Sequence, residues 1–175
     1  MLGRTADGAD KYAFEVVSCP AMKFSTSPSA RARGALDERR VIELCEAAVR
    51  RLADAVPGVE VGALQRTGNI LRHVAHAGEL RLIYEVRRDQ GGVAWRAADT
   101  GEVQLVEDVR SDPDYLASDE RVRAEIAAPV HVGADVAFVL DVEFPGRAFS
   151  AEEALRVEDE AKRLGREAEE AGYSG

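Results

Sequence analysis

The stretch AEIAAPVHVGADVAFVLDVEF, residues 124–144, has the pattern of two β-strands joined by a tight turn. Residues of different character alternate along both halves, as they do in strands that bury one face. One face is uniformly apolar and comprises Ile126, Ala128, Val130, Val132, Phe138, Leu140, Val142 and Phe144. The other face comprises Glu125, Ala127, Pro129, His131, Ala137, Val139, Asp141 and Glu143. The hairpin is therefore predicted to gather three carboxylates on the face away from its apolar side.

The length of the turn decides whether these carboxylates meet. A three-residue loop, 133–135, places Glu125 opposite Glu143 and Ala127 opposite Asp141, whereas a two-residue loop shifts the register by one and separates Glu125 from the other two. We favour the three-residue loop because it also keeps the apolar faces together. Two interpretations stay open: the acids are solvated on a wet sheet face, or they surround a cavity for a cation such as an ammonium group.

The remaining sequence predicts one α+β domain in which terminal helices flank an antiparallel sheet. Asp37 is a candidate N-cap for a helix from about 38 to 56, and Ser150 with Glu153 forms a capping box that opens a helix from about 151 to 171. Strand-like runs cover 59–66, 69–77, 80–86 and a buried run at 103–109, and a short helical segment ends at Gly101. Residues 111–122 are predicted to form a loop.

Composition narrows the function classes. The net charge of −9 argues against nucleic acid or an anionic membrane as a partner, because Lys and Arg supply that attraction. No run approaches the roughly 18 apolar residues of a membrane span, and the first residues lack an apolar secretion signal, so we expect a cytoplasmic location. The predicted organisation is a partly disordered extension over 1–35 (with a strand-like run at 12–18 and a linker at 25–35), a domain over 36–171 and a tail over 172–175.

Cysteine and histidine residues give no cofactor or metal motif. Cys45 lies on the apolar stripe of the first predicted helix and is interpreted as a core residue, whereas Cys19 lies in the extension. His73 and His76 are three apart on a predicted strand, so they should point to opposite faces and cannot share a metal. His131 is expected at the surface. We therefore predict neither a metal nor a cofactor.

The order of several motifs resembles the GAF domain family. The similarity rests on GGVAWRAADTGE (91–102), LVEDVRSDPDYLASDE (105–120), the hairpin 124–144 and RAFSAEEA (147–154), and it extends over about residues 36–170. The resemblance implies an antiparallel sheet with the first and last helices on one face and a ligand pocket under loops on the other. The signature of cyclic-nucleotide-binding GAF domains, the cysteine of bilin-binding ones and the axial histidine of haem-binding ones are not found.

Within that family the sequence is most similar to the free methionine-(R)-sulfoxide reductases. Glu125, Asp141 and Glu143 match the carboxylates that hold the substrate ammonium in those enzymes, so the resemblance implies that they face a ligand. The reductase cysteines, however, correspond to Ala94 and Ser118 here, and the first strand lacks the aromatic residues that clamp the substrate. The resemblance therefore implies a binding site without that catalytic chemistry.

The leading functional hypothesis is a non-catalytic sensor domain that binds an amine- or amino-acid-like ligand and signals to a partner protein or within a homodimer. Its candidate ligand contacts are Glu125, Asp141, Glu143, Ser118, Trp95 and Tyr115; the two aromatic residues could instead serve packing alone. One alternative is an interaction module that dimerises through its terminal helices, helped by a stripe of small residues: Ala154, Val157, Ala161, Leu164 and Ala168. The other is a divergent reductase that uses Cys19.

Overall fold

A computed structural model describes residues 28–80 and 83–173, with side chains described from residue 39 onward. Within these residues the chain forms an α+β fold with a sheet in the order β3-β2-β1-β6-β5-β4, in which every neighbouring pair is antiparallel. The strands are β1 (Glu60–Thr67), β2 (Ile70–Ala77), β3 (Glu85–Arg87), β4 (Gln104–Val106), β5 (Val122–Val132) and β6 (Asp135–Pro145). The helices are α1 (Pro28–Ala55), α2 (Val93–Thr100) and α3 (Ala151–Glu170), with short 3-10 turns η1 (Arg88–Gln90) and η2 (Val109–Ser111). The predicted fold class is confirmed.

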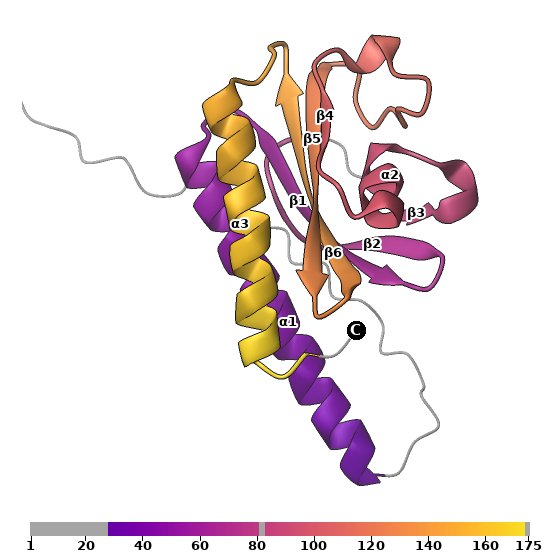
Figure 1. The fold of residues 1–175 in the computed structure, drawn as a ribbon, viewed down its shortest axis with the longest axis vertical. Helices are drawn as coiled ribbons and strands as arrows, with labels where there is room; N and C mark the ends of the chain where they lie inside the picture. Colours follow the sequence, from indigo (N-terminus) through magenta and orange to yellow (C-terminus); the bar gives the residue numbers. More distant parts are fainter. Residues whose placement is uncertain (1–27, 81–82, 174–175) are drawn as a thin grey trace, which may run out of the picture.

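The sheet separates two layers of different character (Figure 1). α1 and α3 lie side by side on one face, where Arg51 of α1 donates to Glu160 of α3 over 2.8 Å. This layer buries the apolar face of the β5–β6 hairpin together with Cys45, whose thiol pKa rises to about 12 through burial. α2 and the loops around it cover the opposite face and form a second, smaller core. A pocket is therefore expected in the second layer.

The central hairpin has the predicted pairing but not the predicted turn. Glu125 lies opposite Glu143 and Ala127 opposite Asp141. The loop, however, has two residues, since Val132 pairs with Asp135, and a bulge at Ala137 then restores the register. The extra residue turns Ala137 to the helix side, where it is buried, although alternation placed it on the carboxylate face. The bulge thus produces the one-residue shift in register that the sequence analysis attributed to a third loop residue.

Local signals located most elements. The β1–β2 hairpin spans the predicted runs, α2 ends at Gly101 in the left-handed conformation, and Ser150 and Glu153 form the capping box of α3. The strand predicted from 80 is only the short β3 in the described residues. β4 is an edge strand whose Leu105 is 54% exposed, so the prediction of a buried strand there is wrong.

The first helix is longer than predicted. α1 begins at Pro28, inside the run interpreted as a linker, and Asp37 lies within the helix and is not its N-cap. Proline suits the first turn of a helix, because its missing N–H would have no partner there. The strand-like run at 12–18 and Cys19 lie outside the described residues. Among the residues described, no helix combines the length and apolar character needed to cross a membrane.

Candidate functional site

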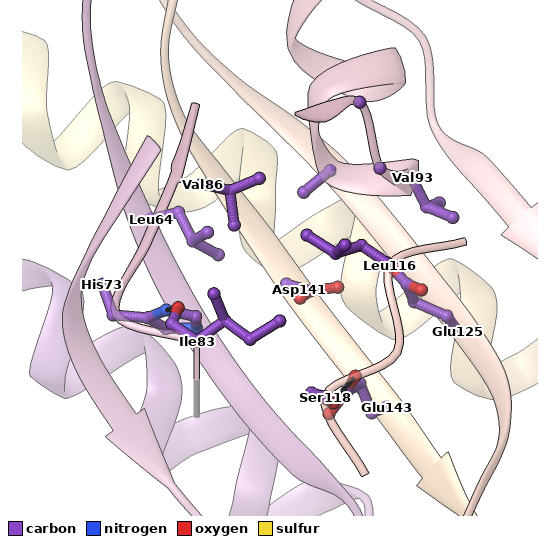
Figure 2. Close-up of a pocket in the computed structure, with 13 residues that line it drawn as sticks. Leu64, His73, Ile83, Val86, Val93, Leu116, Ser118, Glu125, Asp141 and Glu143 are labelled. Carbon is purple, nitrogen blue, oxygen red and sulfur yellow. Dashed lines mark hydrogen bonds between the residues drawn. The ribbon is translucent and has the colours of Figure 1, made fainter. Parts of the chain in front are cut away.

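Glu125, Asp141 and Glu143, called the acidic trio below, lie together on the sheet face that α2 covers. β5 positions Glu125, and β6 positions the other two side chains. They line a cavity of about 50 Å³, shown in Figure 2, whose remaining walls are Leu64, His73, Ile83, Val86, Gly91, Gly92, Val93, Ala94, Leu116 and Ser118. The cavity thus has an acidic floor and mostly apolar walls. It provides room for a few water-sized groups.

The hydrogen bonds of the trio are incomplete. Ser118 Oγ donates to Glu143 Oε1 over 2.7 Å. Asp141 Oδ1 is buried and has no hydrogen-bond partner. Glu125 is only 4% exposed, which is rare for a carboxyl group without a basic partner. A buried acceptor without a donor costs about 1–3 kcal/mol, so the floor of the cavity is not satisfied by the protein alone.

Burial and mutual repulsion keep protons on the trio. Burial raises the pKa of Asp141 to about 6, against a hydrogen bond with Glu125. Burial, followed by the charge of Asp141, raises the pKa of Glu143 to about 8 and that of Glu125 well above its ordinary value. Near pH 7 the negative charge therefore resides mainly on Asp141, while Glu125 and Glu143 retain protons. The floor then carries the charge that balances a single cation.

The segment that brings Ser118 to the cavity is fixed to α2. Arg96 donates to Asp112 over 2.7 Å and to Asp114 over 3.0 Å, and the pairing lowers the pKa of Asp112. Asp112 also accepts from the backbone N–H of Asp114, which closes the turn. Ser118 and Leu116 therefore reach the cavity from a loop that α2 holds in position.

The two predicted aromatic contacts have other positions. Trp95 is 2% exposed and donates from Nε1 to the carbonyl of Val86 over 2.9 Å, and it is not among the residues that line the cavity. Tyr115 packs against the second core, and its hydroxyl is buried without a hydrogen-bond partner. Burial, then the charges of Glu143 and Glu125, raise the pKa of Tyr115. In the described part of the chain no aromatic ring of Phe, Tyr or Trp lines the cavity.

His73 lines the cavity, although the sequence gave no reason to place it there. A bulge at Val74 lies between the pairs Ala63–Ala75 and Leu64–His73, so His73 and His76 share one face. Their ring centroids are 6.5 Å apart, and the prediction that they point to opposite faces is wrong. A bulge depends on the partner strand, which alternation along one strand cannot reveal.

The neighbouring histidine belongs to a different network. His76 Nε2 lies 3.1 Å from Glu60 Oε2, and Glu60 also accepts from the backbone N–H groups of Glu79 and Leu80. Burial alone would raise the pKa of Glu60, but these hydrogen bonds outweigh it and lower the pKa. His131 is exposed and contacts the carbonyl of Gly101. No cluster of three or more His, Cys, Asp or Glu side chains suited to a metal ion is present among the described residues.

Solved structures resemble this fold, although no family model and no curated protein matches the sequence. A free methionine-R-sulfoxide reductase from Neisseria meningitidis, solved with its substrate, aligns with a TM-score of 0.68 at 24% identity and covers 87% of this chain and 97% of its own. A type II reductase from Thermoplasma acidophilum gives 0.69 at 23% identity, covering 77% and 96%. A putative GAF sensor protein from Burkholderia vietnamiensis gives 0.64 at 19% identity, covering 82% and 99%.

These comparisons define the class of protein by its fold. The fold matches those of a GAF sensor protein and of a GAF domain, as the resemblance implied. The similar structures include reductases as well as sensor domains. The chain therefore has a fold similar to that of GAF domains, and its activity has to be inferred from the site.

Proposed function

We propose that this protein is a non-catalytic GAF-type sensor domain that binds a small molecule through an ammonium group. The observation that carries the proposal is the acidic trio on the cavity floor, where Glu125 is buried and Asp141 Oδ1 lacks a hydrogen-bond partner. A solvated sheet face does not account for it, because Glu125 is only 4% exposed and the Oδ1 atom of Asp141 is buried. The reductase from Neisseria meningitidis, which has a similar fold, was solved in complex with its substrate, and this supports a ligand-binding role for the fold.

An ammonium group suits the floor chemically. It offers three N–H donors and one positive charge, whereas the trio offers carboxyl oxygens and, near pH 7, mainly the charge of Asp141. The ligand would satisfy Asp141 Oδ1 and balance the negative charge of Asp141. The apolar walls, which include Leu64, Ile83 and Val86, would then receive the carbon part of the ligand.

The residues at two positions support the proposed absence of catalysis. Thiol-based reduction needs a thiolate nucleophile and a resolving thiol, and the resemblance places Ser118 and Ala94 where the reductases have cysteines. Both residues line the cavity, and a serine cannot form the disulfide that completes such a cycle. Cys45 is a residue of α1 on the other side of the sheet, where burial raises the pKa of its thiol. The reductase alternative thus rests on Cys19, outside the described residues.

The output proposed for the sensor is a change in the covering segments or in the terminal helices. The small-residue stripe of α3 does not present a free surface, because Val157, Ala161, Leu164 and Ala168 are buried in the core of the same chain. Contact between two copies through the terminal helices stays a prediction, and it would have to use the outward, charged sides of α1 and α3.

The test is a thermal-shift and calorimetric screen of amino acids and primary amines. Asp141→Asn keeps the shape of the side chain but removes its charge, so we expect it to abolish the rise in melting temperature that an amine produces. Glu120→Gln, the same kind of change at an exposed position, serves as the matched control. The proposal fails if no amine or amino acid stabilises the wild-type protein, or if the protein reduces free methionine sulfoxide with a thiol reductant.

A further inference from the structure

His73 is a polar residue that lines the cavity and has no role in the proposed function. Its Nδ1 lies 2.9 Å from the carbonyl oxygen of Ile83. A carbonyl oxygen only accepts, so Nδ1 carries the hydrogen. In a neutral imidazole the other nitrogen then has a lone pair and no hydrogen. Nε2 of His73 is therefore an acceptor.

The ring is neutral in its surroundings. Burial, with a smaller contribution from the neighbouring His76, lowers the pKa of His73 to about 4, against the hydrogen bond to Ile83. The titratable groups that share the cavity with His73 are the carboxyl groups of the acidic trio. Because the pKa of His73 is about 4, its ring stays neutral and its Nε2 stays an acceptor throughout the neutral range.

Gly62 makes room for this acceptor. A Cβ atom on Gly62 would lie 2.6 Å from His73 Nε2 and 2.9 Å from its Cδ2, so the imidazole occupies the space of a side chain at that position. A residue other than glycine would displace the ring. Because Gly62 of β1 has no side chain, the imidazole of His73 on the neighbouring strand β2 forms the cavity wall at this position.

The strand register places this acceptor beside the charged floor. Gly62 pairs directly with Asp141 across β1 and β6. Neighbouring strands are about 4.8 Å apart, and a nitrogen atom that donates to two acceptors at about 2.9 Å each can bridge up to about 5.8 Å. Figure 2 shows Asp141 between His73 on one side and Glu125 on the other. One ammonium nitrogen can therefore donate to both His73 Nε2 and Asp141 Oδ1.

We infer that His73 is a ligand-binding and specificity-determining residue whose Nε2 accepts an N–H from the ligand, so that the site selects primary amines over quaternary ammonium compounds. The inference rests on the proposed function and specifies its ligand class. A quaternary ammonium ion has no N–H to donate, and its usual recognition is by aromatic faces. The described residues lining this cavity present carboxyl groups and an imidazole acceptor in place of such a cage.

The experiment compares two pairs of probes that differ only in methylation of the nitrogen: propylamine against trimethylpropylammonium, and glycine against glycine betaine. Calorimetry on the wild-type protein should show the primary amine of a pair binding at least about tenfold more tightly, the value of one charge-assisted hydrogen bond. His73→Asn retains a donor for the Ile83 carbonyl and removes Nε2, so binding of the primary amine should weaken by at least about tenfold.

His76→Gln is the matched control, because it changes a histidine on the same strand and face that does not line the cavity. It retains a donor for Glu60, and binding should stay within twofold of the wild type, about 0.4 kcal/mol. NMR of the wild-type protein labelled with ¹⁵N-histidine gives a readout that does not depend on a variant folding. The signal of unprotonated Nε2 of His73 should move upfield when propylamine or glycine binds, and the signals of His76 should not.

The outcomes separate this inference from the proposed function. If the primary amine binds wild type and His73→Asn equally well and the Nε2 signal does not move, His73 is only a structural wall and the inference is overturned, while the proposed function stands. Equal binding of the quaternary partner also overturns it. If neither primary amine nor any amine of the wider screen binds, both fail together.

Discussion

Glu143→Gln provides a direct test of the protonated state of the acidic trio. Glu143 has a pKa of about 8 in the folded protein, against an ordinary value of 4.5. The folded state therefore holds a proton that the unfolded state has already lost, and the free energy of unfolding falls as pH rises toward 8. The amide of glutamine keeps the shape and the bond from Ser118 but has no proton to lose.

The magnitude follows from the interval between the two pKa values. A retained proton changes the free energy of unfolding by about 1.4 kcal/mol per pH unit. The window from about pH 6.5 to about pH 8 is the informative one, because His73 is neutral there in the folded protein and its titration in the unfolded state affects wild type and Glu143→Gln equally. Over that window we expect the wild-type protein to lose about 2 kcal/mol on account of Glu143, with a further loss from Glu125.

The assay is urea unfolding at several pH values across the window, on ligand-free wild type, Glu143→Gln and the exposed control Glu120→Gln. Glu143→Gln should have a clearly flatter dependence on pH than the wild type, and Glu120→Gln should follow the wild type. Parallel curves for wild type and Glu143→Gln would mean that Glu143 is ionised in the folded protein, and the description of the floor as mostly protonated would be wrong.

Three further expectations can be measured on the same protein. Binding of a primary amine should release protons and become tighter from about pH 6 to about pH 8, because an ammonium group lowers the raised pKa values of the trio. Calorimetry in buffers of different ionisation enthalpy would detect the released protons, and binding without proton release would contradict this expectation. Gly78→Ala should destabilise the protein by more than about 2 kcal/mol in urea unfolding, since Gly78 has φ of 143° and its Cβ would collide with the Glu60 carboxylate. Ser150→Ala should cost about 1 kcal/mol by loss of the α3 cap, and an unchanged urea midpoint would show that the capping box adds nothing.

The fold was largely accessible from the sequence because its signals are local. Alternation between residues 124 and 144 assigned the faces of the central hairpin, and capping chemistry located the start of α3 and the end of α2. The start of α1 was not accessible, because small and polar residues after Pro28 are also typical of a linker. The exposure of Leu105 was missed for a similar reason: whether a strand is at the edge of a sheet depends on pairing, not on its own residues.

The site was accessible only in part. The trio and Ser118 were proposed as cavity residues from alternation and from resemblance, and the structure places them on one cavity. Trp95 was also proposed, but its indole is used to bind the Val86 carbonyl in the core. Alternation along the strand predicted that His73 and His76 lie on opposite faces. The prediction was wrong because the bulge at Val74 interrupts that alternation.

The sequence by itself determined which residues share a face wherever no bulge interrupts a strand, where two helices are capped and that three carboxylates lie on one hairpin. These properties follow from periodicity and from contacts between residues close in the chain. Only the tertiary structure decided that those carboxylates are covered, Glu125 fully and the other two in part, since the walls around them come from α2, β2 and the loop that carries Ser118. Burial removes water, raises the pKa values of the trio and leaves Asp141 Oδ1 without a partner, and it thereby turns an acidic strand face into a site for a cation.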